Sequence, residues 1–143
     1  MKTQYVVQGV VYRRQGTELE FLVVKRVPED GGFWQAITGT REDGEDMVQT
    51  LRRELMEEAG ISQTLHISEC LETYVWRNDA RGIEGEDQVF AVEVASDVPI
   101  VLDGKEHTEF AWCALNDATA LLKYDGNKQS MKRVARYARE NHK

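Results

Sequence analysis

A cluster of acidic residues between positions 45 and 58 is the part of this sequence best suited to chemistry. Glu54, Glu57 and Glu58 are spaced i, i+3 and i+4, so in a helix all three side chains project from one face. Carboxylates at this spacing repel one another, and helix propensity offers no compensation. A divalent cation would neutralise them, and Mg²⁺ or Mn²⁺ prefers hard oxygen ligands of this kind. The sequence therefore predicts a metal site that acts on phosphates.

The acidic residues belong to a longer pattern that runs from Gly39 to Ile61 and reads GTREDGEDMVQTLRRELMEEAGI. Five residues separate Gly39 from Glu45, and seven separate Glu45 from Arg53. With both aliphatic positions filled by Leu55 and Ile61, the pattern resembles the complete signature, or box, of the Nudix hydrolase family. A solvated charged helix face is the alternative for an arbitrary run of glutamates, and the matching glycine, arginine and spacing argue against it.

The resemblance implies a role for each box residue. The expected metal ligands are three carboxylates and one backbone carbonyl: Glu54, Glu57, Glu58 and Gly39. Arg53 lies four residues before Glu57, a salt-bridging distance on a helix, and is expected to orient the carboxylates. Glu45 would support the same cluster from the preceding loop. Catalysis is therefore expected to depend on Glu54, Glu57 and Arg53, with a cation that polarises water and neutralises phosphate charge.

Nudix enzymes often recruit an additional acid from outside the box, as a ligand or as a general base. The candidates in this chain are Glu106 and Glu109. We favour Glu106, because Glu106 and His107 precede an aromatic-x-Trp strand, as in several members of the family. For His107, acid–base chemistry or a phosphate contact stands against the alternative of an ordinary loop histidine.

Three shorter matches resemble the dihydroneopterin triphosphate diphosphatase branch of the family. They are FWQAITG at 33–39, EHTEFAW at 106–112 and NKQ at 127–129. Thr38 stands where many relatives have a second glycine, and this substitution is shared with that branch. Diadenosine tetraphosphate hydrolases share the aromatic-x-Trp strand and remain an alternative.

Contacts to substrate are expected mainly from basic and aromatic residues outside the box. The candidates are Arg26, Trp34, Gln35, Arg77 and Lys128. Arg26 comes first, because it follows a strand that faces the box in the family layout. Burial in the core is the alternative for Trp34, and a solvated surface charge is the alternative for Arg77 and Lys128.

The predicted elements form a mixed α/β arrangement. Strands are expected over 4–13, 20–26, 65–76, 88–95 and 108–114, helices over 46–59, 115–123 and 127–140, and loops over 28–32 and 77–87. In the first helix an apolar stripe of Val48, Leu51, Leu55 and Ala59 should pack on the sheet, and Gly60 should end the helix. This order predicts a mixed sheet between helical layers, which the Nudix α/β/α sandwich fits.

Length and composition indicate a single domain over residues 1–143. The chain is 41% hydrophobic and 30% charged, lacks a membrane-length apolar run and lacks a signal-peptide profile. Cys70 and Cys113 have no metal-type spacing, so we expect a reducing cytoplasm and no disulfide framework. A net charge of −7 argues against a stable nucleic-acid partner and is compatible with a small phosphoanhydride carried in with metal. The chain is expected to be a monomer or a homodimer.

The expected function is metal-dependent hydrolysis of a nucleoside or pterin triphosphate, with release of pyrophosphate or phosphate. A dinucleoside polyphosphate hydrolase is the alternative enzyme. A nucleotide-sensing Nudix domain without turnover is disfavoured, because such domains lose box glutamates and this chain retains them all. Removal of pyrophosphate from RNA 5′ ends is disfavoured by the acidic charge balance.

Overall fold

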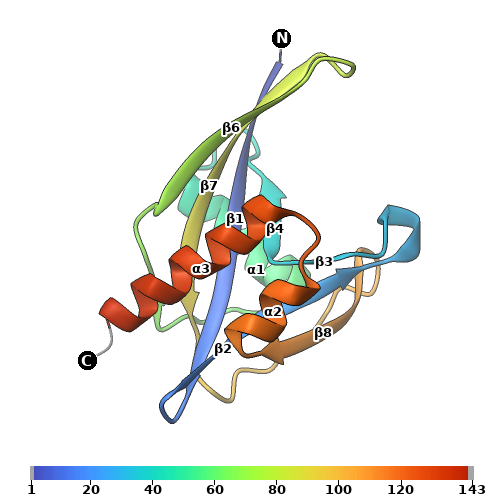
Figure 1. Ribbon diagram of the computed structural model, residues 1–143. Helices are drawn as coiled ribbons and strands as arrows, with labels where there is room; N and C mark the ends of the chain where they lie inside the picture. Colours follow the sequence, from blue (N-terminus) through green and yellow to red (C-terminus); the bar gives the residue numbers. More distant parts are fainter. Residues whose placement is uncertain (1, 142–143) are drawn as a thin grey trace.

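A computed structural model describes residues 2–141 as one mixed sheet with helices on both faces (Figure 1). In chain order the strands are β1 (Lys2–Gln15), β2 (Glu18–Arg26), β3 (Trp34–Gln35), β4 (Ile37–Thr40), β5 (His66–Ile67), β6 (Glu72–Asn78), β7 (Ile83–Glu93) and β8 (His107–Cys113). The helices are α1 (Met47–Ala59), α2 (Leu115–Leu121) and α3 (Asp125–Glu140), with a short 3₁₀ turn, η1 (Pro28–Asp30). The predicted sandwich is confirmed.

Strand β1 is the centre of the sheet. It pairs in parallel with β7 along most of its length. Its other edge is divided, because the amino-terminal half pairs antiparallel with β4 and the carboxy-terminal half pairs antiparallel with β2. Strand β8 continues the sheet beyond β2, and β5 and β6 pair with β7. The sheet therefore brings β4 and β8, which are distant in sequence, to the region beside α1.

Alternation along the strands builds two separate cores. Val7 and Val11 of β1 face α1, whereas Val10 and Tyr12 face α2 and α3. Strand β2 alternates in the same way. The helix layers in Figure 1 cover these two apolar faces. Because each face of β1 and β2 is buried, these strands read as nearly continuous apolar runs in the sequence.

Helix α1 begins and ends where the sequence predicts. Asp46 is its N-cap and forms a capping box with Gln49, whose side chain accepts from the Asp46 amide at 2.8 Å. Gly60 ends the helix in the left-handed conformation with φ 68°. One stripe position was wrong: Val48 is exposed, and Met47 packs against the core in its place with Leu51, Leu55 and Ala59.

Two other predictions are corrected by the structure. Residues 77–87 do not form a long loop, because β6 and β7 continue through them as a hairpin with a turn at 79–82. This hairpin extends past the helices together with the amino-terminal part of β1 (Figure 1). The predicted strand over 65–76 is broken into β5 and β6 by residues 68–71. Among residues 2–141, no helix is both long enough and apolar enough to span a bilayer.

Candidate metal centre

Helix α1 presents its three box glutamates at three different depths. The Glu58 side chain is 3% exposed, that of Glu54 is 12% exposed and that of Glu57 is 59% exposed. Glu58 follows Leu55 by three residues and Leu51 by seven, so it shares the buried face and points into the seam between helix and sheet, and Glu57 points to solvent. The cluster therefore runs from the protein interior to its surface.

Gly39 allows this cluster to approach the sheet. It lies in β4 opposite Val7 of β1, and the side chain of Glu54 crosses directly over its α-carbon. A methyl group at position 39 would overlap the Glu54 carboxylate carbon and its neighbouring methylene. The glycine is thus required for a close approach rather than for a special backbone angle.

Arg53 connects the loop before α1 to the helix. Its guanidinium donates to Glu45 at 2.7 Å and 3.1 Å, to Glu54 at 2.6 Å and to the Thr40 carbonyl oxygen at 3.1 Å. Glu57 accepts from the same guanidinium at 3.3 Å. The hydrogen bonds from Arg53 to Glu45, followed by the one from the Glu42 amide, lower the pKa of Glu45 to about 2. Arg53 therefore fixes the orientation of neighbouring carboxylates, as the sequence predicts.

The loop before β8 places Glu106 and His107 against α1. Asp103 holds this loop, because its Oδ1 accepts from three successive backbone amides, of Lys105, Glu106 and His107, at 2.9 to 3.2 Å. The carbonyl oxygen of Glu106 accepts from the Val27 amide at 2.9 Å. One ligand atom each from Glu58, Glu106 and His107 lies within 4.8 Å of the others. No spacing pattern in the sequence marks Asp103 for this role.

His107 is a core residue, fully buried, and not an exposed loop histidine. Its Nε2 is 2.9 Å from the side-chain amide nitrogen of Gln35, and its Nδ1 is 3.7 Å from Oε1 of Glu58. Burial lowers the pKa of His107, although the Asp103 carboxylate opposes the shift. Burial, followed by the neighbouring carboxylate of Glu54, raises the pKa of Glu58.

The remaining predicted substrate contacts lie at different distances from this cluster. Arg26 pairs with His107 across β2 and β8, and its guanidinium forms an ion pair with Asp30 at 3.4 Å. Gln35 requires correction as a substrate contact, because its side chain is buried and hydrogen-bonded to His107. Trp34 is partly buried against the core under α2 and α3.

Arg77 and Lys128 are not brought to the carboxylates. Arg77 lies on the β6–β7 hairpin, where it forms an ion pair with Asp79. Through the strand pairing, Arg77 and Gly39 lie level with positions of β1 that are four residues apart. This separation corresponds to about 13 Å at roughly 3.3 Å per residue. Lys128 belongs to α3, which covers the face of the sheet opposite α1 (Figure 1).

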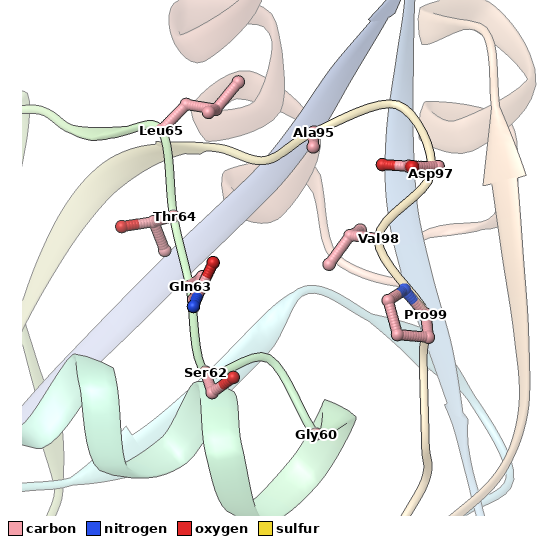
Figure 2. A pocket seen from close by; sticks show the side chains of 9 residues that line it. All are labelled: Gly60, Ser62, Gln63, Thr64, Leu65, Ala95, Asp97, Val98 and Pro99. Atoms are coloured by element: carbon pink, nitrogen blue, oxygen red, sulfur yellow. The ribbon is translucent and has the colours of Figure 1, made fainter.

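A separate pocket of about 320 Å³ lies beyond the carboxyl end of α1 (Figure 2). The segment that leaves the helix lines one side of it, and the segment that follows β7 lines the other. The lining residues are Gly60, Ser62, Gln63, Thr64, Leu65, Ala95, Asp97, Val98 and Pro99. None of the predicted site residues contributes to this pocket, so it is distinct from the carboxylate cluster.

The residues of the cluster fit a divalent cation. Both carboxylate oxygens of Glu58 are buried and have no hydrogen-bond partner among the described residues. A buried ionised carboxylate without a partner is costly, and a bound cation would remove that cost. The neighbouring ligand atoms come from the Glu106 carboxylate and the His107 ring, and carboxylate oxygens are the ligands that Mg²⁺ and Mn²⁺ prefer.

The comparison with known families agrees with this geometry. The family model described as "NUDIX domain" matches residues 2–136. The chain therefore belongs to the NUDIX domain family, and with its box intact it is a pyrophosphohydrolase of that family.

Relatives with several different activities are similar to this chain. An octanoyltransferase of Myxococcus xanthus is 35% identical over 124 residues, which cover 87% of this chain, and the chain spans 34% of that protein's length. A dihydroneopterin triphosphate diphosphatase of Escherichia coli is 28% identical over 133 residues, covering 85% of this chain and 86% of that protein. The crystal structure of an Ap4A hydrolase from C. elegans has a TM-score of 0.83 at 25% identity and covers 96% of this chain and 98% of that one.

Proposed function

We propose that this chain hydrolyses a phosphoanhydride bond in a nucleoside triphosphate-like substrate, with a divalent metal as cofactor. The proposed substrates are dihydroneopterin triphosphate or a nucleoside or deoxynucleoside triphosphate, and the released group is pyrophosphate or phosphate. The observation that carries the proposal is the carboxylate of Glu58, buried without a hydrogen-bond partner beside Glu54 and Glu106.

The proposed metal ligands are the three box glutamates, with the Gly39 carbonyl oxygen as a further ligand. A bound Mg²⁺, or Mn²⁺, would lower the pKa of a water molecule and neutralise charge on the phosphate oxygens. Arg53 keeps Glu54 and Glu57 oriented through its hydrogen bonds.

Glu106 is the proposed general base. Its side chain is exposed, and its backbone is fixed by hydrogen bonds to Asp103 and Val27, so a solvent-facing carboxylate starts from a fixed point beside Glu58. It can accept a proton from an attacking water at the edge of the cluster. Arg26, which faces His107 across the strand pair, is the proposed phosphate contact. Trp34, which pairs with Lys25 next to Arg26, is the proposed contact with the distal part of the substrate. Lys128 is not proposed as a contact, because α3 covers the face of the sheet opposite the carboxylates.

Two substrate classes are supported by different similarities. The FWQAITG, EHTEFAW and NKQ matches, together with the E. coli relative, favour dihydroneopterin triphosphate. The TM-score of 0.83 with the C. elegans Ap4A hydrolase supports a dinucleoside polyphosphate as the second candidate.

Hydrolysis of a substrate panel in ¹⁸O-labelled water with Mg²⁺ or Mn²⁺ separates these candidates. The panel contains dihydroneopterin triphosphate, the nucleoside and deoxynucleoside triphosphates, and diadenosine tetraphosphate. We expect turnover of a triphosphate, with ¹⁸O incorporated into the product that contains the attacked phosphorus atom. Preferential cleavage of diadenosine tetraphosphate would establish the second candidate, and metal-independent turnover would contradict both.

Glu57→Gln should abolish Mg²⁺-dependent turnover and leave the fold unchanged. The side chain is largely exposed, so the amide perturbs little packing, but it removes one anionic oxygen from the cluster. Glu69→Gln is the matched control, because Glu69 is an exposed acid outside the cluster. Activity assays and thermal unfolding of both variants provide the measurement. Near-normal turnover by Glu57→Gln would reject the proposed ligand set.

Cytoplasmic location, the absence of a stable nucleic-acid partner and a monomeric or homodimeric state remain predictions from the sequence. The net charge of −7 continues to favour a small polyanionic substrate over a nucleic-acid duplex.

A further inference from the structure

Three side chains form a continuous line from the core to the metal centre: Gln35 of β3, His107 of β8 and Glu58 of α1. We infer that His107 is a positioning residue, which directs its Nδ1–H at the Glu58 carboxylate while Gln35 holds the ring in that tautomer. The inference rests on the proposed function in one respect, namely that Glu58 is a metal ligand.

The contact with Gln35 determines the tautomer of His107. The ring is fully buried, and a neutral imidazole carries its one proton on either Nδ1 or Nε2. The Gln35 amide nitrogen lies 2.9 Å from Nε2 and acts only as a donor. With the Gln35 side-chain amide in this orientation, Nε2 of His107 accepts the hydrogen bond, which places the ring proton on Nδ1.

The target of that proton is the Glu58 carboxylate. Nδ1 of His107 has no hydrogen-bond partner among the described residues, and both oxygens of Glu58 share this condition. The two unpaired groups face each other, with Nδ1 3.7 Å from Oε1. A shift of about 0.5 Å would bring the two atoms within the range of an N–H···O hydrogen bond.

The consequence is a defined orientation for a buried carboxylate. A donor on one oxygen of Glu58 fixes the rotation of the group and leaves the remaining lone pairs directed at the cluster. A protonated Nδ1 has no lone pair to offer a metal, so His107 acts through Glu58 and does not itself bind the cation. The positioning role is thereby distinguished from a ligand role for the same ring.

The tautomer is measurable without metal or substrate. Long-range ¹H–¹⁵N correlation spectra of the metal-free protein report which ring nitrogen of each histidine carries the proton. The chain has three histidines, and the spectrum of His107→Asn identifies the signals of His107 by their loss. We expect Nδ1 to be protonated. Protonation at Nε2 would overturn the inference.

Metal binding tests the positioning role. Mn²⁺ affinity, measured by electron paramagnetic resonance, should fall about 10- to 100-fold in His107→Leu, the range typical of lost supporting contacts to a ligand. His107→Asn should recover most of that loss, because its amide nitrogen places a donor close to the position of Nδ1. A simple packing defect would not be rescued by the smaller asparagine.

The outcomes separate the two levels of the argument. If the wild-type protein binds no Mn²⁺, the proposed function fails. If wild type and His107→Leu bind Mn²⁺ equally, only the positioning role fails. If circular dichroism shows that His107→Leu does not fold, the tautomer of the wild-type ring decides the question.

Discussion

At the scale of single residues, Gly39 shows how packing accounts for one letter of the box. Any larger residue there would overlap the Glu54 side chain. Gly39→Ala should therefore destabilise the protein by about 1–3 kcal/mol through overpacking, and it should displace the carboxylate of Glu54, a proposed metal ligand, and lower turnover. Urea unfolding and an activity assay measure the two effects.

The control for Gly39→Ala is Gly126→Ala. Gly126 lies in the first turn of α3, with open space where a methyl group would go. Alanine there should be neutral or stabilise the helix by up to about 1 kcal/mol. Equal unfolding midpoints and equal activities for the two variants would contradict the packing argument for Gly39.

Residue spacing predicted which acids share a face of the helix, but not their depth. Glu57 and Glu58 are neighbours in the sequence, yet one is 59% exposed and the other 3% exposed. That difference depends on how α1 sits against β4 and β8. The burial of His107 also depends on long-range strand pairing, so a single histidine in a polar stretch gave no sign of it.

At the scale of elements, α1 is stabilised at its start by Asp46. The side chain accepts from the Gln49 amide at 2.8 Å, and the Gln49 side chain completes the capping box. Asp46→Ala should destabilise the protein by about 1 kcal/mol, whereas Asp46→Asn should retain most of the cap. Thermal unfolding compares the two variants. Equal destabilisation by both would show that the loss is one of charge and not of capping.

The box helix was predictable because its local signals agree. Asp46, the apolar stripe and Gly60 mark its start, its inner face and its end. The hairpin at 77–87 was not predictable from the sequence. Both β6 and β7 carry polar residues where they extend past the helices, and Gly82 and Gly85 are residues typical of loops. Gly85 instead lies under the Trp76 ring, where a side chain would not fit. Cross-strand packing of this kind leaves no periodic trace in one sequence.

At the scale of the whole molecule, the metal centre joins segments that are far apart in the chain. It combines α1 with Gly39 of β4 and with the loop at 103–107. The sequence placed Glu106 there only through its resemblance to the family. Periodicity predicted a mixed sheet between helices, but it carries no information about which strand ends meet.

The buried carboxylate couples metal binding to pH and to global stability. Without metal, burial and the neighbouring acids Glu54, Glu106 and Asp103 raise the pKa of Glu58 above its usual 4.5. A raised carboxyl pKa contributes stability that is fully present below the unfolded value and is lost as pH rises towards the folded value. The metal-free protein should therefore lose stability from this group as the solution becomes more alkaline.

Metal binding should reverse this trend, since the proposed cation would compete with the proton on Glu58. The bound cation stabilises the folded protein by an amount set by the ratio of free metal concentration to Kd, about 2.7 kcal/mol when that ratio is a hundred. The Kd for the cation should fall as Glu58 deprotonates. The rise in unfolding temperature with Mg²⁺ should thus be larger near pH 8 than near pH 6. In Glu58→Gln, which has no proton to lose, the rise should be small and nearly independent of pH. A wild-type shift of equal size at both pH values would mean that the buried carboxylate is not the group on which the cation acts.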